Sequence, residues 1–313
     1  MKKSLKILAV LSCLALVVTL FAACGGNGGN DTTAPAESEA APQDLSAMTI
    51  DELKAQLTTV SDGKLTVATS PDFAPYEFYA LDENGTPQLA GFDMDLAKLI
   101  ADKLGLELEV IPMDFDGTIA ELGAKKVDIG LAGYSPDPDR EGMMNFSEIY
   151  YTGGQSFVTV NAKAEEITSM EVANKADYQI GAQVGSIQVK LAKENTPDAE
   201  IVELAKVTDI IAELLSGKLD GAFIETAVAE SYQKNYPELK IVSDVPYDQE
   251  GSVVGVNKDN AVLLAAVNLI IKDALADGTI DDFVAQANEK AAGATYEGLL
   301  DENGAVTTEA ASE

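Results

Sequence analysis

Arg140 is the only arginine in the sequence, since every other basic side chain is a lysine. It lies in the stretch SPDPDREGMMNFSEIYYTGGQ, residues 135–155. Lysine keeps an exposed surface soluble as well as arginine does, but only the planar guanidinium group of arginine can hold both oxygens of a carboxylate. We therefore expect Arg140 to make a contact that lysine cannot make.

An internal repeat indicates where an opposite charge would lie. The segments TIAELGAKKVDIGLA (118–132) and IIAELLSGKLDGAFI (210–224) share six identical residues at a constant offset of 92. Either a lobe has been duplicated, or two helix–turn–strand units resemble each other by composition. In both cases the strands end at the edge where open α/β sheets bind ligands. Arg140 follows the first strand and Glu225 ends the second, so facing lobes would present a cation and an anion to the carboxylate and ammonium groups of one zwitterion.

Strands and helices alternate along most of the chain, which predicts parallel sheets covered by helices. Thr49 and Glu52 form a predicted capping box at the start of the first helix. The helix over 93–105 is expected to be capped by Asp93 and to end at Gly105. Strands are predicted over 64–70, 106–113, 127–134, 178–185, 199–204, 219–225, 239–245 and 251–257, and helices over 49–57, 93–105, 117–126, 186–195, 207–218, 226–236, 260–278 and 279–292.

The first 23 residues have the pattern of an export signal. Three lysines precede an apolar segment over 7–23, and Ala22 and Ala23 stand directly before Cys24. This end resembles the lipobox of bacterial lipoproteins, which implies cleavage before Cys24 and attachment of lipid, such as palmitate, to it. An uncleaved membrane anchor is the alternative, because these 17 apolar residues lie at the short end of the roughly 17–25 that span a bilayer.

Both ends of the mature chain are predicted to lack regular structure. Residues 24–45 are rich in Gly, Asn, Pro, Ala and acidic side chains, which is typical of a disordered tether. Residues 301–313 are acidic and aperiodic, as in a frayed tail. The globular part is therefore expected between these two segments.

The composition excludes several classes of partner and narrows the chemistry. With 52 acidic and 21 basic residues the net charge is −31, and such a field repels nucleic acid and anionic lipid. The chain has no histidine, and cleavage of the signal would leave one cysteine. We therefore expect no nucleic acid partner, no metal site and no cofactor. An enzyme would have to use Asp72 or Glu225 as its general acid or base.

Seven segments, in this order and spacing, resemble the amino-acid-binding subfamily of bacterial extracellular solute-binding proteins, the receptors of ABC importers. The resemblance covers residues 64–292. The segments are SPDFAPYEF (70–78), GFDMDLAKLIADKLG (91–105), DFDGTIAEL (114–122), KKVDIGLAGYSPDPDREGMMNFSEIYYTGGQ (125–155), GAQVGSIQ (181–188), GKLDGAFIE (217–225) and LADGTIDDF (275–283).

The resemblance implies an α/β fold of the two-lobed, type II periplasmic-binding-protein class. Two parallel or mixed sheets with flanking helices would be joined by hinge crossovers near 156–162 and 246–253. The first lobe would comprise residues 46–158 and 250–300, and the second lobe residues 159–249.

The resemblance also implies a ligand-binding set of residues contributed by both lobes. Arg140 would hold the α-carboxylate group of the ligand and Glu225 its ammonium group. Phe73 and Phe115 would sandwich the ligand side chain, although phenylalanines at such positions are equally expected as core residues. The remaining candidates are Gly133, Ser135, Gln183, Ser186 and Ile187, of which Ser186 and the Ile187 N–H begin a helix whose dipole favours a carboxylate.

The implied function is a non-enzymatic, lipid-anchored receptor on the outer face of the cytoplasmic membrane. It would bind a free polar neutral or basic amino acid between two closing lobes, act as a monomer, and deliver the ligand to the membrane permease of an ABC importer. An amino-acid-sensing lipoprotein without a transporter and a dehydratase-type enzyme on the same fold remain as alternatives.

Overall fold

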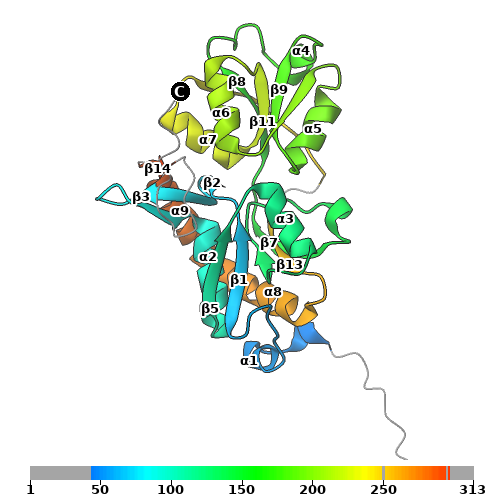
Figure 1. The fold of residues 1–313 in the computed structure, drawn as a ribbon, viewed down its shortest axis with the longest axis vertical. Helices are drawn as coiled ribbons and strands as arrows, with labels where there is room; N and C mark the ends of the chain where they lie inside the picture. Colours follow the sequence, from blue (N-terminus) through cyan, green and yellow to red (C-terminus); the bar gives the residue numbers. More distant parts are fainter. Residues whose placement is uncertain (1–43, 249–250, 294, 297–313) are drawn as a thin grey trace, which may run out of the picture. The chain divides into compact units, whose positions relative to one another are not determined.

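The computed structural model describes residues 44–248, 251–293 and 295–296. The predicted export signal, nearly all of the predicted tether and the acidic tail lie outside the described residues. Two five-stranded mixed sheets with flanking helices make up most of the described chain, and their contacts join them in one compact unit (Figure 1).

The first sheet consists, in order across it, of β5 (Glu107–Pro112), β1 (Lys64–Thr69), β6 (Ile129–Gly130), β13 (Ser252–Asn257) and β7 (Met144–Tyr151). Its neighbouring helices are α2 (Phe92–Leu104), α3 (Phe115–Gly123) and α8 (Ala261–Ala276). β1 runs parallel to β5 and β6, whereas β13 is antiparallel to β6 and β7. The sheet is therefore mixed, because the strand that returns from the second half of the chain enters it in the opposite direction.

The second sheet consists, in order, of β10 (Glu200–Leu204), β9 (Gln179–Gln183), β11 (Gly221–Glu225), β8 (Gln155–Val160) and β12 (Leu239–Asp244). Its helices are α4 (Met170–Ala173), α5 (Ile187–Asn195), α6 (Val207–Ser216) and α7 (Thr226–Asn235). β9 is parallel to β10 and β11, and β8 is antiparallel to β11 and β12. The two sheets thus share one design, in which three parallel strands are followed by one strand of opposite direction and then by an outer strand that runs in the same direction as the first three.

A third, small sheet was not predicted from the sequence. It consists of β14 (Thr295–Tyr296), β3 (Glu77–Leu81) and β2 (Asp72–Phe73), with β4 (Pro87–Ala90) also paired to β3. The Asp82 carboxylate closes the turn between β3 and β4 by accepting hydrogen bonds from the N–H groups of Asn84 and Thr86, both at 2.8 Å. α9 (Thr279–Ala291) packs against α2 and β3, and η1 (Leu45–Ala47) and α1 (Ile50–Lys54) precede β1.

The chain passes between the large sheets twice, and the first passage corrects a predicted boundary. It lies at residues 152–154, between β7 and β8, and is earlier than the expected 156–162. The boundary predicted at residue 158 falls inside β8, which belongs to the second sheet. The sequence gives no sign of the change because β7 and β8 form nearly continuous extended chain. The return passage, between β12 and β13, overlaps the expected 246–253.

The predicted helix ends were right in two cases and wrong in one. Thr49 and Glu52 form the capping box of α1, and Gly105 ends α2 in the left-handed conformation with φ 73°. Asp93 does not cap α2, because the helix begins at Phe92 with Gly91 as its N-cap residue. The fully buried Asp93 instead accepts hydrogen bonds from the Tyr150 hydroxyl group (2.6 Å) and the Gly133 N–H group (3.0 Å).

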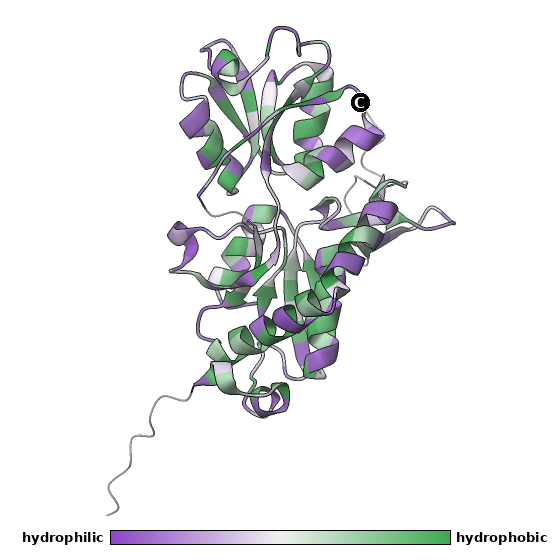
Figure 2. Cartoon of the chain, turned by 180° about the vertical axis from the view of Figure 1, so that it is seen from behind, coloured by the Kyte–Doolittle hydropathy of each residue, from purple (hydrophilic) through white to green (hydrophobic). Residues whose placement is uncertain are grey.

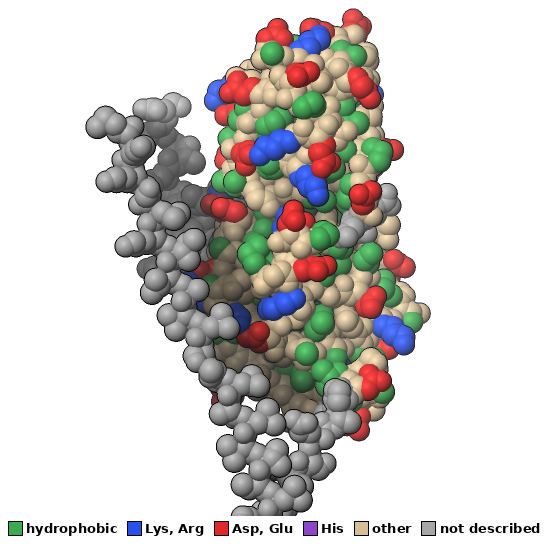
Figure 3. Space-filling model, turned by 90° about the vertical axis from the view of Figure 1, so that its right-hand side faces the viewer, with side chains coloured by type: hydrophobic (Ala, Val, Ile, Leu, Met, Phe, Trp, Pro, Cys, Tyr) green, Lys and Arg blue, Asp and Glu red, His purple; other side chains and the backbone are tan. Residues whose placement is uncertain are grey.

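The helices are amphipathic, and the charged side chains are spread over the surface. The helices that flank the sheets carry hydrophobic residues along one side and hydrophilic residues along the other (Figure 2), so their apolar faces are buried against the strands. On the face drawn in Figure 3, acidic and basic side chains are scattered over the surface rather than gathered into one patch. None of the described helices is long and apolar enough to cross a membrane.

Candidate ligand-binding site

The repeat in the sequence corresponds to a repeated contact in the structure. Asp128 and Asp220 occupy equivalent positions in the two aligned segments. The Asp128 carboxylate accepts from the Thr66 N–H group of β1 at 2.9 Å, and the Asp220 carboxylate accepts from the Gln179 N–H group of β9 at 2.8 Å. The backbone N–H group of Asp128 also donates to the carbonyl oxygen of Thr66, and that of Asp220 donates to the carbonyl oxygen of Gln179. Each aspartate therefore links two neighbouring parallel strands of its own sheet, β1 and β6 in the first sheet and β9 and β11 in the second. The residues that follow β6 and β11 thus leave the two sheets from equivalent positions.

Arg140 ends the short 3₁₀ helix η2 (Pro138–Arg140) and is only 6% exposed. Its Nη2 atom donates to the Gly185 carbonyl oxygen at 2.8 Å, and its Nε atom lies 3.4 Å from a carboxylate oxygen of Asp137. The guanidinium carbon lies 5.8 Å from the centre of the Phe115 ring. Burial lowers the pKa of Arg140 and Asp137 opposes that change, so the side chain remains a buried cation at neutral pH.

Glu225 is the last residue of β11 and also caps α7. It is 3% exposed. Its Oε2 atom accepts from the Val228 N–H group at 2.9 Å, and its Oε1 atom accepts from the Tyr76 hydroxyl group at 3.1 Å. Burial raises the pKa of Glu225 to about 7, and these two hydrogen bonds oppose the rise. A cation placed beside Glu225 would favour its ionised form.

Phe73 and Phe115 are both buried, and both border predicted site residues. The ring of Phe115 lies beneath Arg140 and meets Tyr134 edge-on, with the ring centres 5.6 Å apart. Gly133 lies against Phe73, because a Cβ atom at Gly133 would come within 2.7 Å of the Phe73 ring. A core role and a ligand-binding role are therefore compatible for these phenylalanines, since each ring packs in the first lobe and also borders a candidate site residue.

Gln183 ends β9 and faces a carboxylate from the first lobe. Its Nε2 atom lies 3.2 Å from the carbonyl oxygen of Ala205 and 3.4 Å from Oδ2 of Asp72. The same Asp72 oxygen accepts from the Val207 N–H group, at the start of α6, at 2.6 Å. Burial raises the pKa of Asp72 to about 6. Asp72 was predicted only as a possible acid or base of an enzyme, and its position between the lobes was missed because a lone aspartate has no distinguishing pattern.

The turn before α5 provides the remaining second-lobe candidates. Ser186 is the N-cap residue of α5, and its hydroxyl group donates to the Gln183 carbonyl oxygen at 2.6 Å. Ile187 borders a hollow of about 230 Å³ that Asp137 and Tyr247 also line. The buried Ser135 lies near this hollow, where its hydroxyl group and that of Tyr247 interact. The structure thus brings the turn before α5 close to the loop that carries Arg140.

Two functional candidates were not predicted from the sequence. Tyr76 contacts Glu225 from the first lobe, and Asp93 holds the N–H group of Gly133. A tyrosine in an apolar segment and an aspartate near a helix start each have a commoner structural explanation. Among the residues that the structure describes, no group of three or more His, Cys, Asp or Glu side chains could hold a metal ion.

Two mixed α/β sheets, linked by two crossings and bearing buried polar residues beyond their strand ends, define a type II periplasmic-binding-protein fold. Residues 65–288 match the family of bacterial extracellular solute-binding proteins, family 3, and the chain belongs to this family. The fold class expected from the sequence is therefore confirmed.

Three comparisons illustrate the range of this likeness. The arginine-binding extracellular protein ArtP of Bacillus subtilis is 34% identical over 201 residues, which cover 63% of this chain and 75% of that protein. The crystal structure of an amino acid ABC transporter substrate-binding protein of Streptococcus pneumoniae, bound to L-arginine, has a TM-score of 0.71 and 31% identity, and the match covers 78% of this chain and 100% of that chain. Cyclohexadienyl dehydratase of Pseudomonas aeruginosa is 26% identical over 190 residues, covering 60% of this chain and 69% of that enzyme.

Proposed function

We propose that this protein is an extracellular receptor that binds one free α-amino acid and delivers it to the permease of an ABC importer. The observation that carries this proposal is a buried cation and a buried acid, Arg140 and Glu225, that each reach a partner in the other lobe. Their opposite charges match the α-carboxylate and ammonium groups of one ligand, which lie a few bonds apart in every α-amino acid. The other predicted contacts, to Gly133, Ser135, Ser186 and Ile187, belong to the same proposal.

The residues expected around the ligand side chain favour a basic amino acid, and arginine is the first candidate. Two of the similar proteins are described as binding arginine or as bound to it. In this chain the Asp72 carboxylate and the Gln183 side chain meet, and Asp72 is the neighbour of Phe73 in β2. A guanidinium group could stack on an aromatic ring and donate to a carboxylate at the same time. This set of groups narrows the sequence-based expectation of a polar neutral or basic ligand.

The proposed location is the outer face of the cytoplasmic membrane, where a lipid on Cys24 would anchor a monomeric receptor through the tether. The family supports an extracellular or periplasmic location, and the pattern before Cys24 supports lipidation. Cys24 lies outside the described residues. Division into a first lobe and a second lobe at residues 152–154 and 245–251 is part of this proposal.

Calorimetric titration with all twenty amino acids tests the proposed function. Arginine is expected to bind most tightly, its amide to lose the contact with Arg140, and its analogue without the α-amino group to lose the contact with Glu225. The matched control is a titration with the isolated guanidinium ion, which carries neither group and is expected not to bind measurably. If none of the twenty amino acids binds, the proposal is wrong.

A dehydratase is the second candidate, because Glu225 and Asp72 have pKa values near 7 and 6 and a dehydratase is among the similar proteins. Carboxyl groups with such pKa values can transfer protons at neutral pH. We favour the binding protein, because most of the similar proteins named above are transport receptors. Incubation with a cyclohexadienyl substrate should give no aromatic product, and a measurable turnover abolished by Glu225→Gln would reverse this preference.

A further inference from the structure

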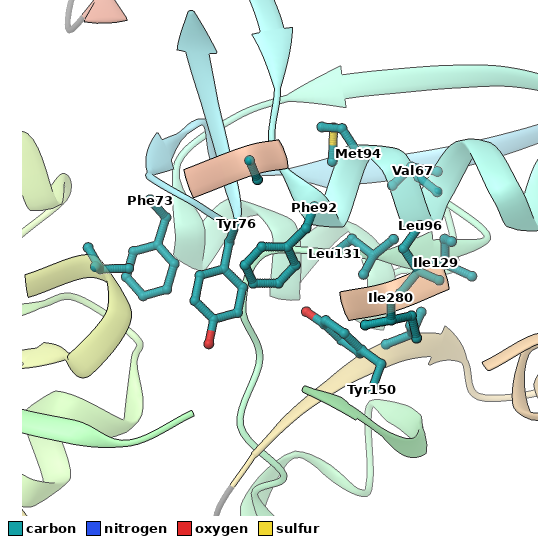
Figure 4. Packing of buried hydrophobic residues seen from close by; sticks show 14 of the residues in the cluster. Val67, Phe73, Tyr76, Phe92, Met94, Leu96, Ile129, Leu131, Tyr150 and Ile280 are labelled. Atoms are coloured by element: carbon teal, nitrogen blue, oxygen red, sulfur yellow. The ribbon is translucent and has the colours of Figure 1, made fainter. Parts of the chain in front are cut away.

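Tyr76 is a fully buried tyrosine held by three other aromatic rings. It lies between β2 and β3, where its N–H group donates to the Phe73 carbonyl oxygen at 2.8 Å. Its ring centre is 5.3 Å from that of Phe73, 4.3 Å from that of Phe92 and 5.6 Å from that of Tyr151. Figure 4 shows the Tyr76 ring between Phe73 and Phe92, with its hydroxyl group pointing out of this aromatic row. The packing therefore fixes the direction in which the hydroxyl group points.

The Tyr76 hydroxyl group lies beside Glu225 and beside residues of both passages between the sheets, Gly153 in the first and Ser252 at the end of the second. It donates to Oε1 of Glu225 at 3.1 Å and lies 3.1 Å from the hydroxyl group of Ser252, at the start of β13. Because a tyrosine hydroxyl group has one proton and also accepts, Ser252 can donate to it while it donates to Glu225. A Cβ atom added to Gly153, in the first passage, would lie 2.4 Å from Oε1 of Glu225 and 2.8 Å from the Tyr76 hydroxyl oxygen. Glycine at position 153 thus leaves room for this contact.

We propose that Tyr76 is a positioning residue of the amino-acid site, whose hydroxyl group crosses between the lobes and holds the ionised carboxylate of Glu225 towards the ligand ammonium group. This inference rests on the proposed function. Both carboxylate oxygens of Glu225 accept hydrogen bonds, Oε2 from the Val228 N–H group within the second lobe and Oε1 from the Tyr76 hydroxyl group in the first lobe. A carboxylate with both oxygens held cannot rotate away from its partner. A hydrogen bond to the charged form also favours ionisation.

Among the ionisable groups around this contact, Glu225 is the one whose ionisation we expect the Tyr76 hydroxyl group to affect. Tyr151 and Tyr247 are near enough to Glu225 to interact with its charge, and burial raises the pKa of each tyrosine above its ordinary value, so both stay neutral. Asp93 faces Tyr76, but its carboxylate is bonded to Tyr150 and Gly133. Burial raises the pKa of Asp93 to about 6, and both of its hydrogen bonds are made within the first lobe.

The test is a pair of pH titrations on the full processed chain and its Tyr76→Phe variant. Burial raises the pKa of Glu225 to about 7, so the titration covers roughly pH 5.5 to 9, above the ordinary range of a glutamate. Amino-acid affinity, measured by calorimetry, should rise as Glu225 ionises and then level off. In Tyr76→Phe the midpoint should move to higher pH, and the affinity at pH 7 should fall about tenfold or more, as expected when a hydrogen bond to a charged group is lost. Tyr178→Phe is the matched control, because it removes a hydroxyl contact to the Glu166 carboxylate within the second lobe and should leave the midpoint unchanged.

A second measurement does not depend on the ligand. The carboxyl carbon signal of Glu225, followed by NMR in the absence of amino acid, should titrate at higher pH in Tyr76→Phe than in the parent protein. Gly153→Ala, which crowds the same contact, should shift this signal in the same direction.

Each possible outcome decides the inference. An unchanged Glu225 titration in Tyr76→Phe, or a loss of affinity that is equal at every pH, would overturn it and show that Tyr76 only packs the core. Should the parent protein bind no α-amino acid, the proposed function fails and the inference fails with it. If amino acids bind and only the midpoint shift is missing, the proposed function stands without the inference.

Discussion

Replacing Arg140 should weaken amino-acid binding far more than replacing any other basic residue. The side chain is almost fully buried, and its removal would leave the ligand carboxylate without a partner in a desolvated site. Truncating one member of such a pair costs about 2–5 kcal/mol, which corresponds to roughly 30- to 4,000-fold in affinity. The upper half of this range is expected for Arg140→Ala, because the change also leaves Asp137 without its ion-pair partner and removes the bond to Gly185.

Arg140→Lys should fall between the parent protein and Arg140→Ala. Lysine restores the charge but cannot hold two carboxylate oxygens with one planar group. We expect a loss of about ten- to a hundredfold, or about 1.4–2.8 kcal/mol.

Calorimetric titration with arginine and with arginine amide separates a lost contact from general damage, because a variant without Arg140 should barely distinguish the two ligands. Lys175→Ala is the matched control, since it removes another cation that lies over an aromatic ring, 4.5 Å from the Tyr178 ring centre. If Arg140→Ala binds arginine within about threefold of the parent protein, less than 1 kcal/mol, Arg140 is a structural residue and the site is wrongly assigned.

Three further outcomes follow from other parts of the chain. Glu77 is fully buried, and burial and the neighbouring carboxyl group of Asp93 raise its pKa well above the ordinary value of 4.5. The folded protein therefore holds a proton on Glu77 that the unfolded chain releases, so stability should fall as pH rises above that ordinary value. Melting curves of Glu77→Gln should show a weaker fall. Parallel curves for both proteins would contradict this. Cys24→Ala should release the protein from membranes or leave it unprocessed, as fractionation and mass spectrometry would show, and a lipid-free mature protein that still carries residues 1–23 would refute lipidation. Small-angle scattering should give a smaller radius of gyration with saturating arginine, because both lobes contribute contacts, and an unchanged radius would mean that only one lobe binds.

The elements that local sequence controls were predicted well. The capping box of α1 and the glycine at the end of α2 depend on side chains within one helical turn, so the pattern is sufficient. The aligned segments around Asp128 and Asp220 were also informative, because the same residue types make the same contact with the first strand of each parallel set. Short-range periodicity and a repeated contact both leave a signal in the sequence.

The elements that distant residues create were not predicted. β3 pairs with β14, which lies more than 200 residues later in the chain, so no local pattern marks their pairing. Asp93 occupies the first turn of a helix, where aspartate is common for reasons of the helix dipole, and only the folded chain shows that it is bonded to Gly133 and Tyr150. A residue's type limits what it can bond, whereas its partner is set by tertiary structure.

The two charges of the candidate site illustrate this difference. The sequence indicated Arg140 and Glu225 by their types and positions, but it could not show that each has a partner from the opposite lobe, the Gly185 carbonyl group for Arg140 and the Tyr76 hydroxyl group for Glu225. Burying an unpaired charge is costly, so these neutral partners offset part of that cost without neutralising either charge. Arginine has five N–H donors and a carboxylate has about four acceptor positions, so both groups keep hydrogen-bonding capacity beyond these contacts. At the proposed site a ligand would therefore add its own charged contacts to side chains that are already oriented, and would not have to displace the protein contacts that orient them.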